Sequence, residues 1–124
     1  MAEKKTVLVI DDDMDILESL SIVLAAEGFE VLTVSSGREG IALLDRRVPD
    51  LILCDMMMES IDAGMQTAQQ IRHRLPEVPI FLLSSIAAAT AATTEIRELG
   101  FTGVLQKPVD PQHVVTVVKN TLKA

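Results

Sequence analysis

The sequence predicts an α/β domain built on a doubly wound, five-stranded parallel sheet with helices on both faces. Five short runs suited to strands alternate along the chain with segments whose apolar residues recur at helical spacing. Two of these runs, residues 7–10 and 51–54, are apolar without interruption, which is typical of strands buried on both faces of a parallel sheet. Because the crossovers between parallel strands are right-handed, this alternation places helices on both faces.

The first half of the chain supplies two strands and two helices. Residues 7–10 form the first expected strand, and residues 30–34 form a second, more polar strand that we place at an edge of the sheet. The helix between them is expected to stop at Gly28, and the next helix opens with the capping-box pattern of residues 36–39. The apolar positions that define these two helices are Ile16, Leu17, Leu20, Val23, Leu24, Ile41 and Leu44.

The third strand is the centre of the predicted sheet. Residues 48–50 contain a proline that ends the preceding helix, and four apolar residues then lead directly to Asp55. After Asp55 we expect a loop that runs to about Gly64, followed by a third helix. The apolar stripe of that helix consists of Met65, Ala68, Ile71 and Leu75.

Two further strands complete the sheet. Residues 80–83 and 102–106 are expected to be strands, with an alanine- and threonine-rich helix between them at about 88–99. The last helix begins at Asp110, an N-cap residue that is followed by a proline at the first helical position. The apolar residues of this helix are Val114, Val115, Val117, Val118 and Leu122.

Length and composition limit the possible classes of protein. With 124 residues, of which 48% are hydrophobic, we expect one folded domain over residues 1–124 and no output domain in this chain. The formal net charge of −7 argues against direct binding to nucleic acid. No stretch is long and apolar enough to cross a membrane, and the first six residues do not form a signal peptide. Cys54 is the only cysteine and is expected to be a buried thiol, so a cytoplasmic location is expected.

Acidic residues follow two of the expected strands. The first strand is followed by Asp11, Asp12 and Asp13, and the third strand ends in Asp55. The carboxyl ends of parallel strands meet at one edge of the sheet, where open α/β sheets bind ligands. Several carboxylates in one cleft repel one another and favour a cation, and hard oxygen ligands suit Mg²⁺. The alternative interpretation is that these acids only cap a helix, which is the role we expect for Asp13.

Four motifs in this order resemble the receiver domain of two-component response regulators. They are Val-Ile-Asp-Asp at 9–12, Leu-Ile-Leu-Cys-Asp at 51–55, Phe-Leu-Leu-Ser at 81–84, and Lys-Pro at 107–108. Each motif alone has little specificity, but all four are present with the expected elements between them, and the resemblance covers essentially the whole chain. It implies a flavodoxin-like sheet with the strand order 2-1-3-4-5.

The resemblance also implies a role for each site residue. Asp55 would accept a phosphoryl group as the nucleophile and form an acyl phosphate. Mg²⁺ would be held by Asp12, Asp55 and the backbone carbonyl of Met57, with Asp11 acting through a bound water. Lys107 would pair with Asp55 and later with a phosphoryl oxygen. Ser84 would donate a hydrogen bond to another phosphoryl oxygen.

Three positions depart from the family pattern. Glu59 stands where the family usually has a proline, and Ala63 stands where it usually has a glycine, with Gly64 following one residue later. From this we expect a loop that is one residue longer than usual. The third departure is Val104, at a position that is commonly aromatic in the family.

Val104 and Ile86 are the candidate positions through which phosphorylation would be transmitted to a partner. At Val104 the type of side chain limits how this can happen. Valine is stiff at χ1 and too small to swing between a buried and an exposed pose. We therefore expect the output to run through the backbone of residues 84–90, which include Ile86, and through the start of the alanine-rich helix. That helix has few large apolar anchors, so reshaping it should cost little free energy.

The resemblance implies a signalling switch that catalyses only its own phosphorylation and dephosphorylation. Its expected partners are a sensor histidine kinase or phosphotransfer protein and a downstream protein target, with no membrane contact, and we expect a monomer or a weak dimer. An alternative is an aspartate-dependent phosphatase of the haloacid-dehalogenase type, whose Asp-x-Asp motif residues 11–15 could mimic. That class places its nucleophile after the first strand, whereas the best-placed acid here follows the third. A flavodoxin-like cofactor carrier is weaker still, because three aspartates would repel a phosphate.

Overall fold

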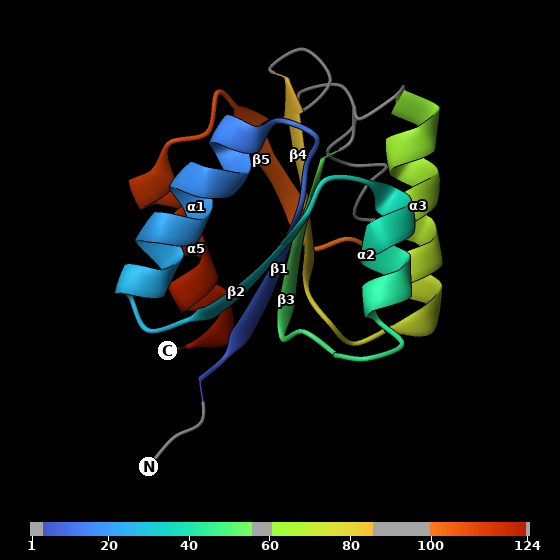
Figure 1. Cartoon of the computed structure of the whole chain (residues 1–124), viewed down its shortest axis with the longest axis horizontal. Coiled ribbons are helices and arrows are strands. Elements are labelled where there is room, and N and C mark those ends of the chain that lie inside the picture. The colour runs from blue at the N-terminus through green and yellow to red at the C-terminus, as the bar shows by residue number, and fades with distance from the viewer. Residues whose placement is uncertain (1–3, 56–60, 86–99, 124) are drawn as a thin grey trace.

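The computed structural model describes residues 4–55, 61–85 and 100–123. Five parallel strands form one sheet in the order β2-β1-β3-β4-β5, as expected (Figure 1). Their bounds are β1 Thr6–Ile10, β2 Glu30–Val34, β3 Leu51–Asp55, β4 Ile80–Ser85 and β5 Gly103–Lys107. The predicted fold class and strand order are therefore confirmed.

Helices cover both faces of the sheet. Helices α1 (Met14–Ala26) and α5 (Pro111–Leu122) lie on one face, and α2 (Gly37–Leu43) and α3 (Ile61–Arg74) lie on the other (Figure 1). The alanine-rich helix predicted at 88–99 falls outside the described residues, as do Met57, Glu59 and Ile86. No helix in the described parts of the chain is long and apolar enough to cross a bilayer.

The continuous apolar runs of β1 and β3 are explained by the two core layers. On β1, Val7 and Val9 pack toward α1 and α5, whereas Leu8 and Ile10 pack toward α2 and α3. Successive side chains of a strand point to opposite faces, so a strand covered on both faces has no position for a solvated residue. All five residues of β1 and all five of β3 are buried.

The predicted N-caps of α1, α2 and α5 are correct, with one difference of detail. Asp13 caps α1 by accepting a hydrogen bond from the Asp15 N–H at 2.9 Å, and Asp110 caps α5 in the same way. Ser36 accepts from the Glu39 N–H at 3.2 Å, which is half of a capping box. The Glu39 carboxylate accepts from the Ser36 hydroxyl at 3.4 Å, where a full box would bind the Ser36 backbone N–H.

The predicted start of α3 and the predicted end of β5 are wrong. Helix α3 already begins at Ile61, so Ala63 and Gly64 lie within a helix and not in the long loop that was expected to reach Gly64. A glycine inside a helix costs only about 1 kcal/mol relative to alanine, which the rest of a 14-residue helix can offset. Strand β5 extends to Lys107, so this lysine is the last strand residue and not the first residue after the strand.

Helix α2 approaches the sheet closely through Gly40. A Cβ atom at Gly40 would lie 2.6 Å from Ile10 Cδ1, well inside van der Waals contact. Ile10 is fully buried, so its side chain has little room to move away. The absence of a side chain at residue 40 thus sets the distance between α2 and β1.

We predict that Gly40→Ala lowers the free energy of unfolding by about 1 kcal/mol, because the overpacking outweighs the better helix propensity of alanine. Urea denaturation in the wild-type and Ile10→Val backgrounds provides the check. Ile10→Val removes the Cδ1 atom and leaves a Cγ1 contact of 3.2 Å, so Gly40→Ala should cost clearly less there. An equal cost of Gly40→Ala in both backgrounds would show that this contact is not responsible.

Candidate functional site at the carboxyl edge of the sheet

Three carboxylates converge where β1 and β3 end. Asp11 and Asp12 follow β1, and Asp55 is the last residue of the neighbouring β3. The register pairs Ile10 with Cys54, so the next residue on each strand is an aspartate at the same level. One ligating oxygen from each of the three aspartates lies within 4.8 Å of the others. This confirms the predicted meeting of the acidic strand ends.

The three acids differ in their surroundings. Asp11 and Asp55 are buried, whereas Asp12 is exposed. Asp11 Oδ1 accepts a hydrogen bond from the Asp13 N–H at 2.9 Å, so the first turn of α1 holds this carboxylate in place. Burial and then the charge of Asp55 raise the pKa of Asp11, although the Asp13 N–H and Lys107 oppose this effect.

Lys107 reaches into the cluster from the end of β5. Its Nζ lies 3.1 Å from Asp11 Oδ2 and 3.3 Å from Asp55 Oδ1, so it bridges the two buried acids. Burial disfavours its charge, but the hydrogen bond and charge of Asp11, together with Asp55, outweigh that effect and raise the pKa of Lys107. The pairing with Asp55 was predicted from the sequence, whereas the closer pairing with Asp11 was not.

Ser84 lies on β4, between the strands that carry Asp55 and Lys107. Its side chain is fully buried, and its hydroxyl has no hydrogen-bond partner in the described part of the chain. Buried hydroxyls are rarely left without a partner, so this one fits a donor to an oxygen that a bound group would bring. The register places Ser84 one residue beyond Leu83, the partner of Asp55.

Asp13 also positions Asp11, a role that was not predicted from the sequence. Its side-chain cap of α1 was predicted, but its backbone N–H also holds Asp11. An aspartate whose side chain accepts from the N–H two residues later is a common turn, so the spacing of Asp11 and Asp13 could have indicated this bond. Cys54 next to Asp55 is buried, and its burial raises the pKa of the thiol to about 12, which agrees with a packing role.

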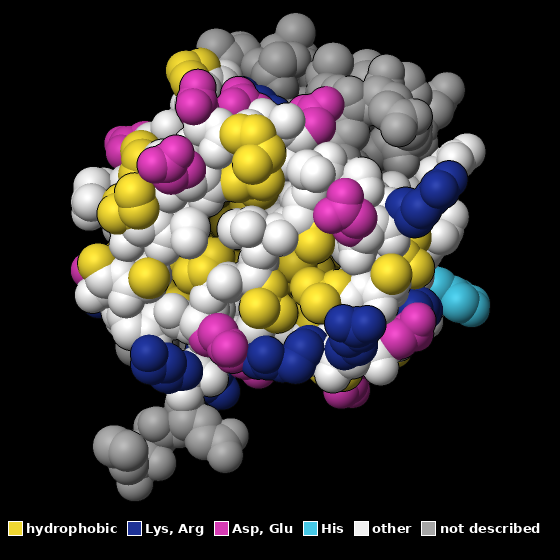
Figure 2. Space-filling view, viewed as in Figure 1, with side chains coloured by type: hydrophobic (Ala, Val, Ile, Leu, Met, Phe, Trp, Pro, Cys, Tyr) yellow, Lys and Arg dark blue, Asp and Glu magenta, His cyan; other side chains and the backbone are white. Residues whose placement is uncertain are grey.

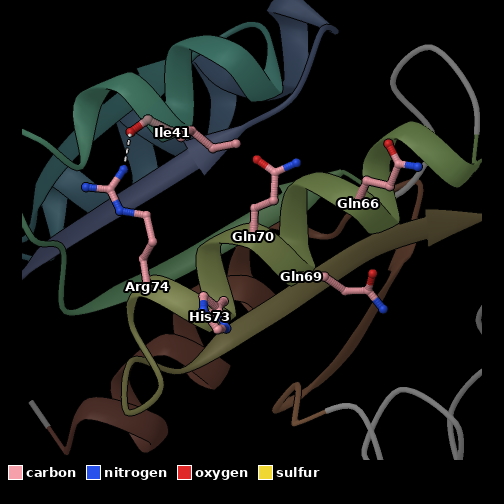
Figure 3. A pocket seen from close by; sticks show the side chains of 6 residues that line it. All are labelled: Ile41, Gln66, Gln69, Gln70, His73 and Arg74. Atoms are coloured by element: carbon pink, nitrogen blue, oxygen red, sulfur yellow. Dashed lines mark hydrogen bonds between the residues drawn. The ribbon is translucent and has the colours of Figure 1, made fainter.

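A hollow between α2 and α3 is separate from the acidic cluster. It is lined by Ile41, Gln66, Gln69, Gln70, His73 and Arg74 (Figure 3). The Arg74 guanidinium donates to the Ile41 carbonyl oxygen at 3.3 Å and pairs with Asp45 at 2.6 Å, so its charge is already engaged. None of the predicted site residues that the structure describes is among these lining residues.

The whole chain resembles a single protein family. A family model described as the response regulator receiver domain matches residues 7–119. The transcriptional regulatory protein GlrR of Escherichia coli (strain K12) is 35% identical over 94% of this chain and 26% of its own length. The hydrogenase transcriptional regulatory protein HoxA of Cupriavidus necator is 34% identical over 100% of this chain and 26% of its own length. The chain therefore spans about a quarter of the length of these two curated relatives.

Solved structures give the same assignment. A response regulator from Chloroflexus aurantiacus J-10-fl has a TM-score of 0.83 and 31% identity, covering 98% of this chain and 100% of that one. The chemotaxis response regulator CheY4 of Vibrio cholerae has a TM-score of 0.84 and 27% identity, with 95% and 98% covered. The phosphatase and cofactor-carrier alternatives gain no support from these matches. With its sheet order, its acidic strand ends and this family match, the chain belongs to the response regulator receiver domains of two-component signalling.

Proposed function

We propose that this domain is switched by transfer of a phosphoryl group to Asp55. The observation that carries the proposal is the position of the Asp55 carboxylate, buried beside Asp11 and only 3.3 Å from the Lys107 ammonium. An ammonium that bridges two buried carboxylates can remain and bind a phosphoryl oxygen once Asp55 is modified. The domain would catalyse only its own phosphorylation and the loss of that group.

The proposed step is a displacement at phosphorus. An Asp55 carboxylate oxygen forms a bond to the phosphorus atom of a phosphohistidine, and the phosphorus–nitrogen bond breaks. The nitrogen leaves with the bonding electron pair, so the donor histidine is restored, and Asp55 becomes an acyl phosphate. Lys107 Nζ and the Ser84 hydroxyl then bind two of the phosphoryl oxygens, which gives a partner to a buried hydroxyl that has none among the described residues.

We also propose a Mg²⁺ site in the cluster. Asp11, Asp12 and Asp55 offer hard oxygen ligands within 4.8 Å of one another, and Asp12 is open to solvent. The predicted fourth ligand, the carbonyl of Met57, lies outside the described residues. When bound, the ion would neutralise charge on the transferring oxygens.

The proposed partners are proteins. The phosphoryl donor would be a sensor histidine kinase or a phosphotransfer protein, and a hollow of about 550 Å³ lies beside Lys107, lined also by Ser19 and Val109. The relatives named above are called transcriptional regulators, but they extend well beyond the region that this chain matches. Because the chain has a formal net charge of −7, we propose that this receiver domain passes its signal on through contacts with a protein and not by binding DNA.

Phosphorylation itself provides the main test. We predict that the protein gains the mass of one phosphoryl group from a small acyl-phosphate donor in the presence of Mg²⁺, and that Asp55→Asn does not, because an amide is a poor nucleophile. Intact-protein mass spectrometry measures the yield. The matched control is Asp13→Asn, which keeps the helix cap and should be modified to the same extent as the wild type. Modification of Asp55→Asn at the wild-type yield would place the acceptor at another residue.

The route of the output is a further proposal. Val104 is half-buried among the core residues between the sheet and α2/α3, and it pairs with Leu82 on β4. A valine held in this way is a poor rotamer switch. We therefore propose that the signal leaves through the backbone of residues 84–90, of which 86–90 lie outside the described residues.

Beryllofluoride, a mimic of the bound phosphoryl group, tests this route by NMR. We predict that its amide shifts concentrate at residues 84–90 and at Lys107, and that they are the same in Val104→Ala as in the wild type. Leu105→Ala serves as a control for general loosening of β5, because Leu105 packs on the other face of the sheet. Loss of the shifts at 84–90 in Val104→Ala alone would show that this side chain carries the output.

A further inference from the structure

The outer edge of β2 is open in the described sheet. Among the described strands, β2 pairs only with β1, in register from Thr6 and Glu30 to Ile10 and Val34. The Glu30 N–H donates to the Lys5 carbonyl at 2.9 Å, and the Val34 carbonyl accepts from the Asp11 N–H at 3.2 Å, so the even-numbered residues of β2 face β1. Successive backbone groups of a strand point in opposite directions. The N–H and C=O groups of Val31 and Thr33 therefore point away from the sheet.

This edge lacks three of the usual features that prevent pairing with another strand, and its one charged residue, Glu30, is paired with Arg47. Edge strands are commonly protected by lysine, proline or a β-bulge, but the sequence Glu-Val-Leu-Thr-Val has no lysine or proline and pairs with β1 without a bulge. Of its five residues, Thr33 alone is exposed, and the others are half-buried. Strand β2 crosses the middle of the face drawn in Figure 1, and hydrophobic side chains gather there in Figure 2.

The two ends of this face, taken along the direction of β2, differ in charge. In Figure 2, acidic side chains predominate toward the upper end, where β2 ends, and most of the basic side chains lie along the lower border, with acidic ones among them. A shallow hollow of about 460 Å³ runs along α2 beside Val34, with exposed Glu39 near the start of the helix and exposed Arg46 after its end. A face with opposite charges at its two ends complements itself when it is rotated by 180°.

We propose that the β2 edge binds a second copy of this chain through antiparallel pairing of the two β2 strands. Val31 of each copy would lie opposite Thr33 of the other, and each such pair would exchange two backbone hydrogen bonds. The same two-fold axis places Glu39 of each copy toward Arg46 of the other. The two sheets then form one continuous sheet, and the interface closes after two copies. This inference goes beyond the proposed phosphorylation and does not depend on it.

Sedimentation equilibrium over a wide range of protein concentration tests the proposal. The full chain should show a monomer–dimer equilibrium, and Thr33→Lys should weaken the association by about tenfold or more, because lysine is a common protecting residue on edge strands. Gln69→Lys is the matched control: it adds the same charge at an exposed position on α3, and its side chain points away from α2 (Figure 3). It should associate as the wild type does. A monomer at every concentration, or equal dimerisation of the Thr33→Lys and wild-type chains, would overturn the proposal.

A charge exchange tests the antiparallel orientation. Arg46→Glu and Glu39→Lys should each weaken self-association, because each places like charges opposite one another. An equimolar mixture of the two variants should associate several-fold more strongly than either variant alone, since the opposite charges meet again in the mixed dimer. This comparison also controls for any loss of the α2 cap in Glu39→Lys. A mixture that associates no better than its components, or species that grow beyond the dimer, would contradict the two-fold arrangement.

Discussion

The ion pair network of Lys107 with Asp11 and Asp55 is the interaction on which the site depends. Three carboxylates have oxygens within 4.8 Å, and the Lys107 ammonium lies 3.1 Å from one and 3.3 Å from another. The charge of Lys107 alone cannot balance three carboxylates, two of which are buried. The rest of the domain must therefore hold together a cluster that repels itself until a cation offsets its charge.

The parallel sheet supplies that support. Strands β1 and β3 are buried along their whole length, so the apolar layers on both faces fix the level at which Asp11 and Asp55 emerge. Strands β4 and β5 bring Ser84 and Lys107 to the same edge. Asp55 and Lys107 are the last residues of their strands, Asp11 directly follows β1, and Ser84 is the second-to-last residue of β4. The sheet therefore positions these groups with the precision that the proposed phosphoryl transfer needs.

Much of this arrangement could be predicted from the sequence, since unbroken apolar runs and acidic strand ends are local signals. The start of α3 could not be predicted in this way. Gly64 suggests a loop, and its unfavourable helix propensity is offset only by the other residues of the helix. The ion pair between Lys107 and Asp11 depends on how far β1 and β5 each extend toward the carboxyl edge of the sheet. These two strands are not neighbours in the sheet, so no local pattern sets their relative positions. Likewise, the contact of Gly40 with Ile10 reflects the depth of α2 on the sheet, which no local pattern encodes.

The thermal stability of Asp12→Asn with and without Mg²⁺ tests the central claim most directly. If the acids are held together against their repulsion, removing the exposed charge should stabilise the Mg²⁺-free protein by up to about 1 kcal/mol. Millimolar Mg²⁺ should then raise the Tm of the wild type, but much less that of the variant. Glu77→Gln, which removes an exposed charge far from the site, should respond to Mg²⁺ as the wild type does. The account would be contradicted if Asp12→Asn melted below the wild type without Mg²⁺ and if Mg²⁺ left the wild-type Tm unchanged. These acids would then be ordinary structural caps.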